Sequence, residues 1–342
     1  MHALTALFLA LPISALAGSH EPWAHRRRAQ HWTRNEPVTF ARRGVTYKLS
    51  DNFSGQALLD NFNFYNQADP THGLVQYVDA QTAKNEGLAV VQDDGVVKLN
   101  VDSTTQLQAG QPRKSVRLES KKTYNSGLFI GDFFAMPTGC GTWPAYWTVN
   151  GNEWPNGGEL DIIEGVNLNT DNQITAHTGP TCTLSGGHIN AALGHLVSPT
   201  CTSSADSNSG CPWTPQGNAS YGHNFNVQGG GVYAHLWDST GISVWFFSRG
   251  SVPGDITSGN PDPSSWGQAT AVFPNTDSCQ TTKHFHDHTI VINTSLCGDW
   301  AGNAFNDGGK CTGTCDAWVA DPSHFKYAHW AIASIKVYQP QN

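Results

Sequence analysis

The most informative chemistry in the sequence is a cluster of three carboxylic acids within six residues. Glu159, Asp161 and Glu164 are interleaved with Leu and Ile in the run Glu-Leu-Asp-Ile-Ile-Glu. On a regular β-strand Glu159 and Asp161 share one face, whereas the odd step of three residues sends Glu164 to the opposite face. A β-bulge at Ile162-Ile163 would return Glu164 to the face of the other two. We therefore predict a bulged strand that presents three acids together.

Three acids on one face repel each other, which raises the pKa of at least one and favours a shared proton. That arrangement suits cleavage of a glycosidic bond with retention, in which one carboxylate attacks the anomeric carbon and a second acid protonates the leaving oxygen. The alternatives are a calcium site or a solvated acidic strand. Calcium loops place oxygen ligands on turns with Gly and Asn, not between Leu and Ile. We therefore interpret Glu159, Asp161 and Glu164 as catalytic residues.

The elements that must position these acids are predicted to be strands. Only 13% of the 342 residues are charged, while Gly (35), Pro (18), Phe (15) and Trp (12) are frequent. This composition excludes a disordered chain and a helical bundle. Turn-rich stretches separate short aromatic or alternating runs, which predicts one all-β sandwich decorated by loops. The runs are 115–120, 127–134, 144–149, 159–164, 173–178, 232–237, 242–247, 289–294 and 332–338.

The N-terminus has the features of an export signal. Residues 3–16 are almost uninterruptedly apolar and precede the small-x-small pattern Ala15-Leu16-Ala17, which predicts a signal peptide over residues 1–17 and a secreted protein. The Arg clusters at 26–28 and 42–43 suggest a propeptide over 18–43, although solvated basic residues are the alternative. The catalytic domain would then cover 44–342. No later segment is apolar for long enough to span a membrane.

The charge and cysteine content restrict the partners and the compartment further. Residues 1–43 hold six of the 19 Lys and Arg but two of the 27 Asp and Glu, so the remainder is strongly acidic and unsuited to nucleic acid. Eight Cys fit an oxidising compartment and up to four disulfides of unknown pairing; a zinc site is the rival, but no Cys-x-x-Cys pair exists. Sequons occur at Asn52, Asn218 and Asn293. We expect Asn293, in an apolar run, to be buried in a strand and unmodified.

Several longer segments, taken in order, make the chain similar to a known family. The acidic run follows Trp-Pro-Asn-Gly-Gly, and residues 69–73 (Asp-Pro-Thr-His-Gly), 139–147, 229–234 and 297–302 (Cys-Gly-Asp-Trp-Ala-Gly) also match. From about Thr46 to Gln339 the sequence resembles glycoside hydrolase family 16, in its fungal laminarinase-like branch. The resemblance implies an all-β jelly-roll sandwich of two antiparallel sheets with the substrate in a concave cleft. It also implies Glu159 as nucleophile, Asp161 as assisting residue and Glu164 as acid/base.

The same resemblance suggests side chains that bind sugar. Sugar rings present apolar C–H faces that stack on aromatic planes, so Trp residues in the matching segments are candidates, with core packing as the alternative for each. In the family an Arg matching Arg117 reaches sugar hydroxyls, and His177 matches a His beside the acid/base; a paired surface Arg and a structural His are the alternatives. The expected substrate-binding residues are Arg117, Trp143, Trp147, Trp154, His177 and Trp300.

A histidine run at 284–288 offers a possible metal site. Period two would place His284, His286 and His288 on one strand face, a geometry that could bind zinc, whereas a polar loop is the alternative. The expected chemistry needs no metal or other cofactor, and the signatures of serine hydrolases, zinc proteases and phosphate-binding loops are missing.

We therefore predict a secreted, monomeric, retaining endo-β-glucanase that cuts β-1,3 or mixed β-1,3/1,4-glucan, with no nucleic-acid or membrane partner. One alternative is a transglycosylase of the same fold that uses the same carboxylates. Another is a non-catalytic β-glucan-binding lectin, which would lack Glu159 or Glu164.

Overall fold

The computed structural model of the chain describes residues 44–187, 189–204, 207–215, 217 and 219–341. The predicted signal peptide and propeptide, residues 1–43, lie outside the described residues, as does the sequon at Asn218. Strands dominate the described part of the chain, and its α-helices have at most six residues. These helices are α1 (Gln56–Asp60), α2 (Ala80–Asn85), α3 (Gly222–Val227), α4 (Gly254–Thr257), α5 (Thr281–His284) and α6 (Cys315–Ala320).

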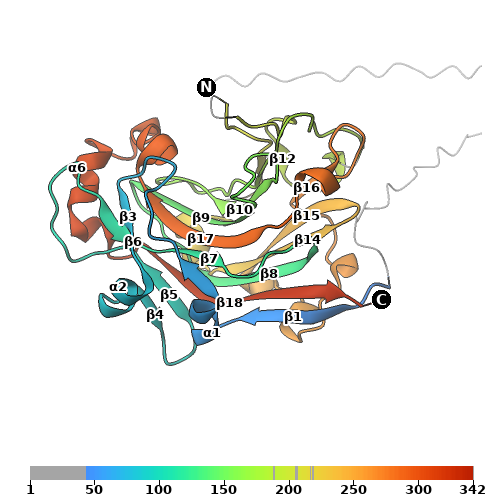
Figure 1. Ribbon diagram of the computed structural model, residues 1–342, viewed down its shortest axis with the longest axis horizontal. Coiled ribbons are helices and arrows are strands. Elements are labelled where there is room, and N and C mark those ends of the chain that lie inside the picture. The colour runs from blue at the N-terminus through green and yellow to red at the C-terminus, as the bar shows by residue number, and fades with distance from the viewer. Residues whose placement is uncertain (1–43, 188, 205–206, 216, 218, 342) are drawn as a thin grey trace, which may run out of the picture. The chain divides into compact units, whose positions relative to one another are not determined.

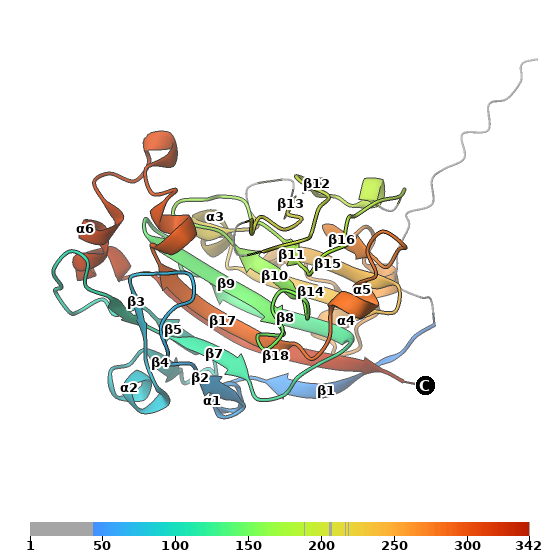
Figure 2. The ribbon, with the colours of Figure 1, turned by 45° about the horizontal axis from the view of Figure 1, so that its top comes forward.

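The first of two large sheets has six antiparallel strands and carries the acidic run. Its order is β11-β10-β9-β17-β7-β2, and Figure 2 shows these strands side by side. The strands are β2 (Phe62–Phe64), β7 (Arg117–Ser120), β9 (Thr142–Val149), β10 (Glu159–Glu164), β11 (Thr175–His177) and β17 (Thr289–Leu296).

The second large sheet has eight strands in the order β16-β15-β14-β8-β18-β5-β4, with β1 also paired to β18. The strands are β1 (Tyr47–Phe53), β4 (Ala89–Val91), β5 (Val97–Asn100), β8 (Gly127–Ala135), β14 (Gly231–Asp238), β15 (Gly241–Ser248), β16 (Ala271–Pro274) and β18 (His329–Pro340). The two sheets lie one above the other (Figure 1). The predicted all-β sandwich is confirmed.

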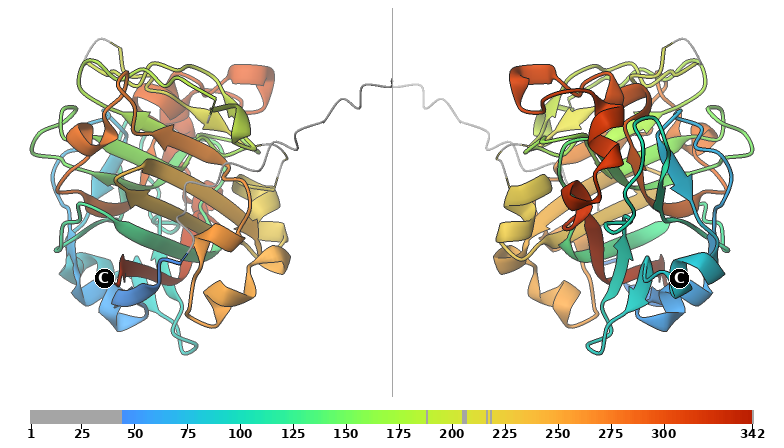
Figure 3. Two further views of the ribbon diagram at one scale, coloured as in Figure 1. Left: turned by 90° about the vertical axis from the view of Figure 1, so that its right-hand side faces the viewer. Right: turned by 90° about the vertical axis from the view of Figure 1, so that its left-hand side faces the viewer.

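Smaller elements border the sandwich. Two short strand pairs are β3 (Val75–Tyr77) with β6 (Arg113–Ser115) and β12 (His195–Leu196) with β13 (Trp213–Thr214). The single helical turns are η1 (Ile189–Ala191), η2 (Arg249–Ser251), η3 (Pro263–Ser265), η4 (Gly298–Gly302), η5 (Asp307–Gly309) and η6 (Pro322–Phe325). Figure 3 views the sandwich from both ends and shows α6, in red, at one of them.

Alternation along the strands separates the core from a second, concave face. Tyr146 on β9 and Leu160 and Ile162 on β10 are at most 2% exposed and join the apolar core between the sheets. On β9 the neighbours Ala145 and Trp147, and on β10 Glu159 and Asp161, therefore point away from the eight-stranded sheet. In Figure 1 the ends of β9 and β17 turn away from the eight-stranded sheet, so this outer face is concave. We refer to it below as the concave face.

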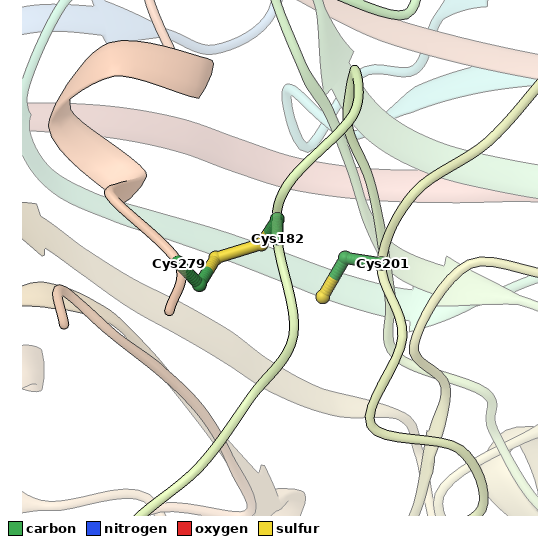
Figure 4. Close-up of side chains that lie close together, drawn as sticks. All are labelled: Cys182, Cys201 and Cys279. Carbon is green, nitrogen blue, oxygen red and sulfur yellow. A yellow bond between two sulfur atoms is a disulfide. The ribbon is translucent and has the colours of Figure 1, made fainter. Parts of the chain in front are cut away.

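All eight Cys form disulfides, as the sequence predicted. The pairs are Cys140–Cys311, Cys182–Cys279, Cys201–Cys211 and Cys297–Cys315. Figure 4 shows Cys182 bonded to Cys279, with the sulfur of Cys201 nearby. These three sulfurs lie within 4.8 Å of one another, but each belongs to a disulfide, so none is the thiolate that zinc requires.

The described residues contain no helix that is both long enough and apolar enough to cross a bilayer.

Candidate active site

The acidic run forms β10, and the predicted bulge is present in it. Opposite β9, Asp161 pairs with Trp147, whereas Ile163 pairs with Tyr146 and Glu164 with Ala145, so the register shifts between Asp161 and Ile163. Because Trp147 and Ala145 are two residues apart, they share one face of β9. Glu164 therefore lies on the concave face with Asp161 and Glu159, and the extra residue is accommodated within the core.

A histidine on the neighbouring strand approaches the middle acid. His177 on β11 pairs with Glu159 in the strand register, and its Nε2 lies 3.3 Å from Oδ2 of Asp161. This distance is within the range of an ion pair, but among the described residues that Oδ2 has no hydrogen-bond partner. The other ring nitrogen, Nδ1, lies 2.9 Å from the hydroxyl of Ser203. The ring is thus fixed from the side opposite the acids.

Burial raises the pKa of all three acids, and repulsion by Asp161 adds to the rise for Glu159 and Glu164. Desolvation is the main cause for each and raises the pKa of Glu159, Asp161 and Glu164 to about 8. The charge of Asp161 raises the pKa of Glu159 and Glu164 further, while His177 opposes the rise in both. The acids cannot all be charged at neutral pH, so the cluster retains at least one proton. That proton is available for acid catalysis.

Trp143 contacts the last acid directly. Its indole Nε1–H donates a hydrogen bond of 2.9 Å to Oε1 of Glu164, and this bond favours the charged form of the carboxyl. The ring of Trp143 also meets Trp300 of η4 edge-on, with centroids 5.7 Å apart. Trp143 thus connects the acid to the loop that carries Trp300.

The other Trp of β9 belongs to a polar and aromatic group farther across the concave face. Nε1 of Trp147 donates to Oδ1 of Asn293 (2.8 Å), and Nδ2 of Asn293 donates to the Tyr77 hydroxyl (3.1 Å). The Arg117 guanidinium lies over the rings of Trp147 (5.1 Å) and Tyr65 (4.4 Å). Arg117 also pairs with Glu119 at 2.7 Å, so its planar group is held in place.

Asn293 has a position that the sequence partly predicted. It is 7% exposed and lies within β17, as expected from its apolar run. Its place opposite Ala145 and Arg117 puts it on the concave face, a role that sequence reasoning did not assign. The period-two pattern of 289–294 was the available signal.

Trp154 lies in the loop before β10, and residues 284–288 hold the end of this loop in place. Trp154 is half-buried, and its side chain lies where it favours the charged form of Glu159 and so limits the rise in the pKa of that acid. Gly158 has a φ of 83°, and a side chain there would come within 2.4 Å of the His284 carbonyl, so only Gly fits. The carbonyl of Gly157 lies 2.8 Å from Nε2 of His288.

The prediction that the three histidines share one strand face is wrong. His284 ends α5, and Asp287, with a φ of 53°, turns the backbone before β17 begins. His288 is 1% exposed, and its Nδ1 lies 2.9 Å from the Thr148 hydroxyl. Burial lowers the pKa of His288 to about 4. His288 is therefore a neutral residue that fixes the loop before Glu159.

The sequence-predicted site residues thus gather on one sheet. The strands β7, β9, β10 and β11 carry seven of them, while Trp154 and Trp300 approach from loops. The seven are Arg117, Trp143, Trp147, Glu159, Asp161, Glu164 and His177. Ligand atoms of Glu159, Asp161 and His177 lie within 4.8 Å of one another, close enough to share a cation. The raised carboxyl pKa values of Glu159 and Asp161 are also the kind of shift that suits groups exchanging protons near neutral pH.

Several known proteins are similar to this chain. Residues 62–338 match the XgeA-like catalytic domain of glycoside hydrolase family 16. A probable glycosidase of Schizosaccharomyces pombe is 42% identical over 298 residues, covering 86% of this chain and 70% of that protein. An endo-1,3(4)-β-glucanase of Emericella nidulans is 41% identical over 304 residues, covering 86% of this chain and 47% of that protein. The chain thus spans about half the length of that glucanase.

Two solved structures are similar over their whole length. Laminarinase 16A of Phanerochaete chrysosporium, described with β-glucans in its donor and acceptor sites, is 44% identical with a TM-score of 0.82. A family 16 elongating β-1,3-glucosyltransferase is 40% identical with a TM-score of 0.79. Each comparison covers 86% of this chain and 100% of the solved chain.

Proposed function

Because the chain belongs to glycoside hydrolase family 16, we propose that it is a retaining endo-β-glucanase that cuts β-1,3 or mixed β-1,3/1,4-glucan. The observation that carries this proposal is the register shift between Asp161 and Ile163. It supports the catalytic assignment because it places Glu164 beside Asp161 and Glu159 on the concave face. The similar glucanase and laminarinase support the choice of substrate.

In the first step the Glu159 carboxylate attacks the anomeric carbon of the glucosyl unit. The bond from that carbon to the glycosidic oxygen breaks, its electron pair stays on the oxygen, and Glu164 delivers a proton there. The products are a glucosyl ester on Glu159 and a free alcohol at the end of the departing glucan. The side chain of Trp154, which lowers the pKa of Glu159, and the hydrogen bond from Trp143 to Glu164 stabilise the two carboxylates when each is charged.

In the second step ionised Glu164 takes a proton from water, and the water oxygen attacks the same carbon. The ester bond breaks and the Glu159 carboxylate is restored, so two inversions give net retention. Asp161 assists by holding negative charge between the other two acids, which keeps the pKa of Glu164 high enough for proton donation. His177 balances part of that charge from β11.

Substrate contacts follow from the same face. We assign Trp147, Trp154 and Trp300 to stacking on sugar rings, because each is only partly buried. Trp147 and Trp154 lie beside the acids, and Trp300 contacts the ring of Trp143. Arg117 would donate to sugar hydroxyls from its position between Tyr65 and Trp147. Trp143 would contact substrate less, because its N–H is already engaged by Glu164.

Transfer to a second sugar is the competing outcome for the same intermediate. The similar elongating glucosyltransferase favours keeping it as a candidate, since the acids are the same and only the acceptor differs. A lectin is disfavoured, because both Glu159 and Glu164 are present on the concave face.

We further propose that residues 44–342 form the catalytic domain of a secreted, monomeric protein. The four disulfides support an oxidising compartment. N-terminal sequencing of secreted material would test the signal peptide over 1–17 and the propeptide over 18–43, and light scattering would test the monomer.

The substrate proposal is tested by reducing-sugar release from laminarin, lichenan, cellulose and a galactan, followed by product sizing. We expect fast release of short oligosaccharides from laminarin or lichenan and none from the other two. Added laminaribiose would reveal transfer as products longer than the substrate. Preferential cleavage of the galactan would contradict the proposal.

A further inference from the structure

The bulge in β10 interrupts strand pairing on its β11 side. The ladder between β10 and β11 runs from Glu159 opposite His177 to Asp161 opposite Thr175 and ends there. The backbone groups of β10 beyond Asp161 therefore cannot continue in the β11 ladder, although Ile162 and Ile163 are fully buried. Buried backbone N–H and C=O groups without partners destabilise a fold. Something other than a strand must satisfy them.

One side chain does so on both sides of the bulge. Nδ2 of Asn172 donates to the Ile162 carbonyl at 2.7 Å, and Oδ1 of Asn172 accepts from the Glu164 N–H at 2.9 Å. The next residue, Gln173, donates its N–H to the Glu164 carbonyl at 3.0 Å. The amide of Asn172 thus replaces a peptide group of β11, and both backbone polar groups of Glu164 are held from this segment.

Asn172 is itself held rigidly. It is 0% exposed, and its own N–H donates to the hydroxyl of Ser220 at 3.1 Å. A buried amide with donor and acceptor both engaged has no freedom to rotate away. Its grip acts on the backbone of Glu164 rather than on the carboxyl, which Trp143 contacts separately.

We propose that Asn172 is a positioning residue for the acid/base. Its amide locks the bulge between Ile162 and Glu164 and thereby fixes which face of β10 the Glu164 carboxyl occupies. This inference rests on the proposed role of Glu164. Without Asn172 the extra residue of the bulge could move along the strand, and Glu164 would leave the distance from the glycosidic oxygen at which proton transfer works. A displacement of about 1 Å can cost about 100-fold in rate.

The test compares two leaving groups. Asn172→Ala should lower kcat on laminarin by about 10- to 100-fold, because a sugar alcohol needs protonation to depart. With a 2,4-dinitrophenyl laminaribioside, whose leaving group needs no acid, formation of the glycosyl-enzyme should change only a few-fold. Azide should then accelerate turnover of this substrate and yield a β-glycosyl azide, as for Glu164→Ala.

A second variant and a matched control exclude a merely structural effect. Asn172→Asp preserves the side-chain volume and loses the donor to Ile162 when ionised. It should therefore show the same split, a large loss on laminarin with a small change on the dinitrophenyl substrate, even if Asn172→Ala folds poorly. Asn226→Ala is the control, because the Asn226 amide also bonds a backbone N–H and a backbone C=O, both of Met136 at 2.9 Å. Met136 directly follows β8 of the other sheet, away from the acids. Asn226→Ala should lower the melting temperature without any split or azide product.

The outcomes separate the two proposals. If Glu164→Ala shows the split and the azide product but both Asn172 variants lose activity equally on both substrates, the positioning role is wrong and the catalytic assignment stands. If Glu164→Ala itself shows neither, the assignment of Glu164 is wrong and the role of Asn172 is wrong with it.

Discussion

The three acids behave as one electrostatic unit whose protonation is set by identifiable neighbours. Asp161 raises the pKa of Glu159 and Glu164 through its charge, whereas the indole N–H of Trp143 lowers the pKa of Glu164 by bonding its charged form. These two residues therefore act on Glu164 in opposite directions. Because proton donation requires neutral Glu164, the rate should fall as pH rises through the pKa of Glu164, which is about 8.

Substitution of these neighbours should shift that alkaline limit in opposite directions. Asp161→Asn removes a negative charge, so the pKa of Glu164 falls and the alkaline limb of kcat/KM moves to lower pH. Trp143→Phe removes the bond that stabilises the carboxylate, so the limb moves to higher pH, with a loss of about 10-fold or more in rate. Profiles of kcat/KM against pH on laminarin would measure both shifts. Equal shifts in one direction would contradict the electrostatic account.

At the scale of elements, the loop that carries Trp300 is fastened by two disulfides. Cys297–Cys315 closes the loop on itself, and Cys140–Cys311 ties it to the start of β9. Beside Trp300, this loop and residues 166–169 enclose a groove of about 350 Å³. The segment that follows Glu164 thus faces a loop that disulfides hold in place, which suits a surface that binds a polymer.

Removal of the Cys297–Cys315 disulfide should affect substrate binding as well as stability. Opening the 18-residue Cys297–Cys315 loop should cost about 3 kcal/mol by loop entropy. In the Cys297→Ala/Cys315→Ala variant, Trp300 would lose its fixed position, so KM for laminarin should rise several-fold while kcat changes little.

The matched control removes Cys182 and Cys279, a disulfide that does not close the Trp300 loop. This control should lose stability, measured by urea unfolding, without the rise in KM. A fall in kcat at constant KM in the first variant would argue against a binding role for that loop.

The bulge in β10 could be predicted from the sequence, but the role of Asn172 in supporting it could not. The odd step from Asp161 to Glu164 predicts an irregularity, because pleating is strictly two-residue and the Ile side chains must stay buried. Asn172 gave no such signal, since its partners are backbone groups eight and ten residues away across an interrupted ladder. For the same reason β11 is shorter than the predicted run 173–178. The histidine run misled because a positive φ at Asp287 breaks its period.

At the scale of the whole molecule, two buried histidines in the sandwich should lower the stability of the fold at acidic pH. His235 on β14 is 1% exposed and stacks on Phe129 of β8 with ring centroids 4.4 Å apart. In the part of the chain that the structure describes, neither of its ring nitrogens has a hydrogen-bond partner. Burial lowers its pKa to about 3 and that of His288 to about 4. The unfolded chain binds protons at these sites below about pH 6.5, but the folded protein does not until pH 3 to 4.

Stability should therefore fall as the pH drops from about 6.5 toward 4, by on the order of 1 kcal/mol per pH unit for each histidine. His235→Phe removes one such site and keeps an aromatic ring against Phe129, so its free energy of unfolding should decline less steeply over this range. Urea unfolding at several pH values would measure the slopes. Parallel slopes for the variant and the unaltered protein would show that His235 does not contribute.

The central claim is that the bulged strand makes Glu159 the nucleophile of a retaining enzyme. The most direct measurement is trapping with a 2,4-dinitrophenyl 2-deoxy-2-fluoro laminaribioside, followed by fragmentation of the labelled peptide in a mass spectrometer. The fluorine slows both steps and the good leaving group restores only the first, so the ester should accumulate on Glu159. A label on any other residue, or turnover with no covalent intermediate and an inverted first product, would contradict the account.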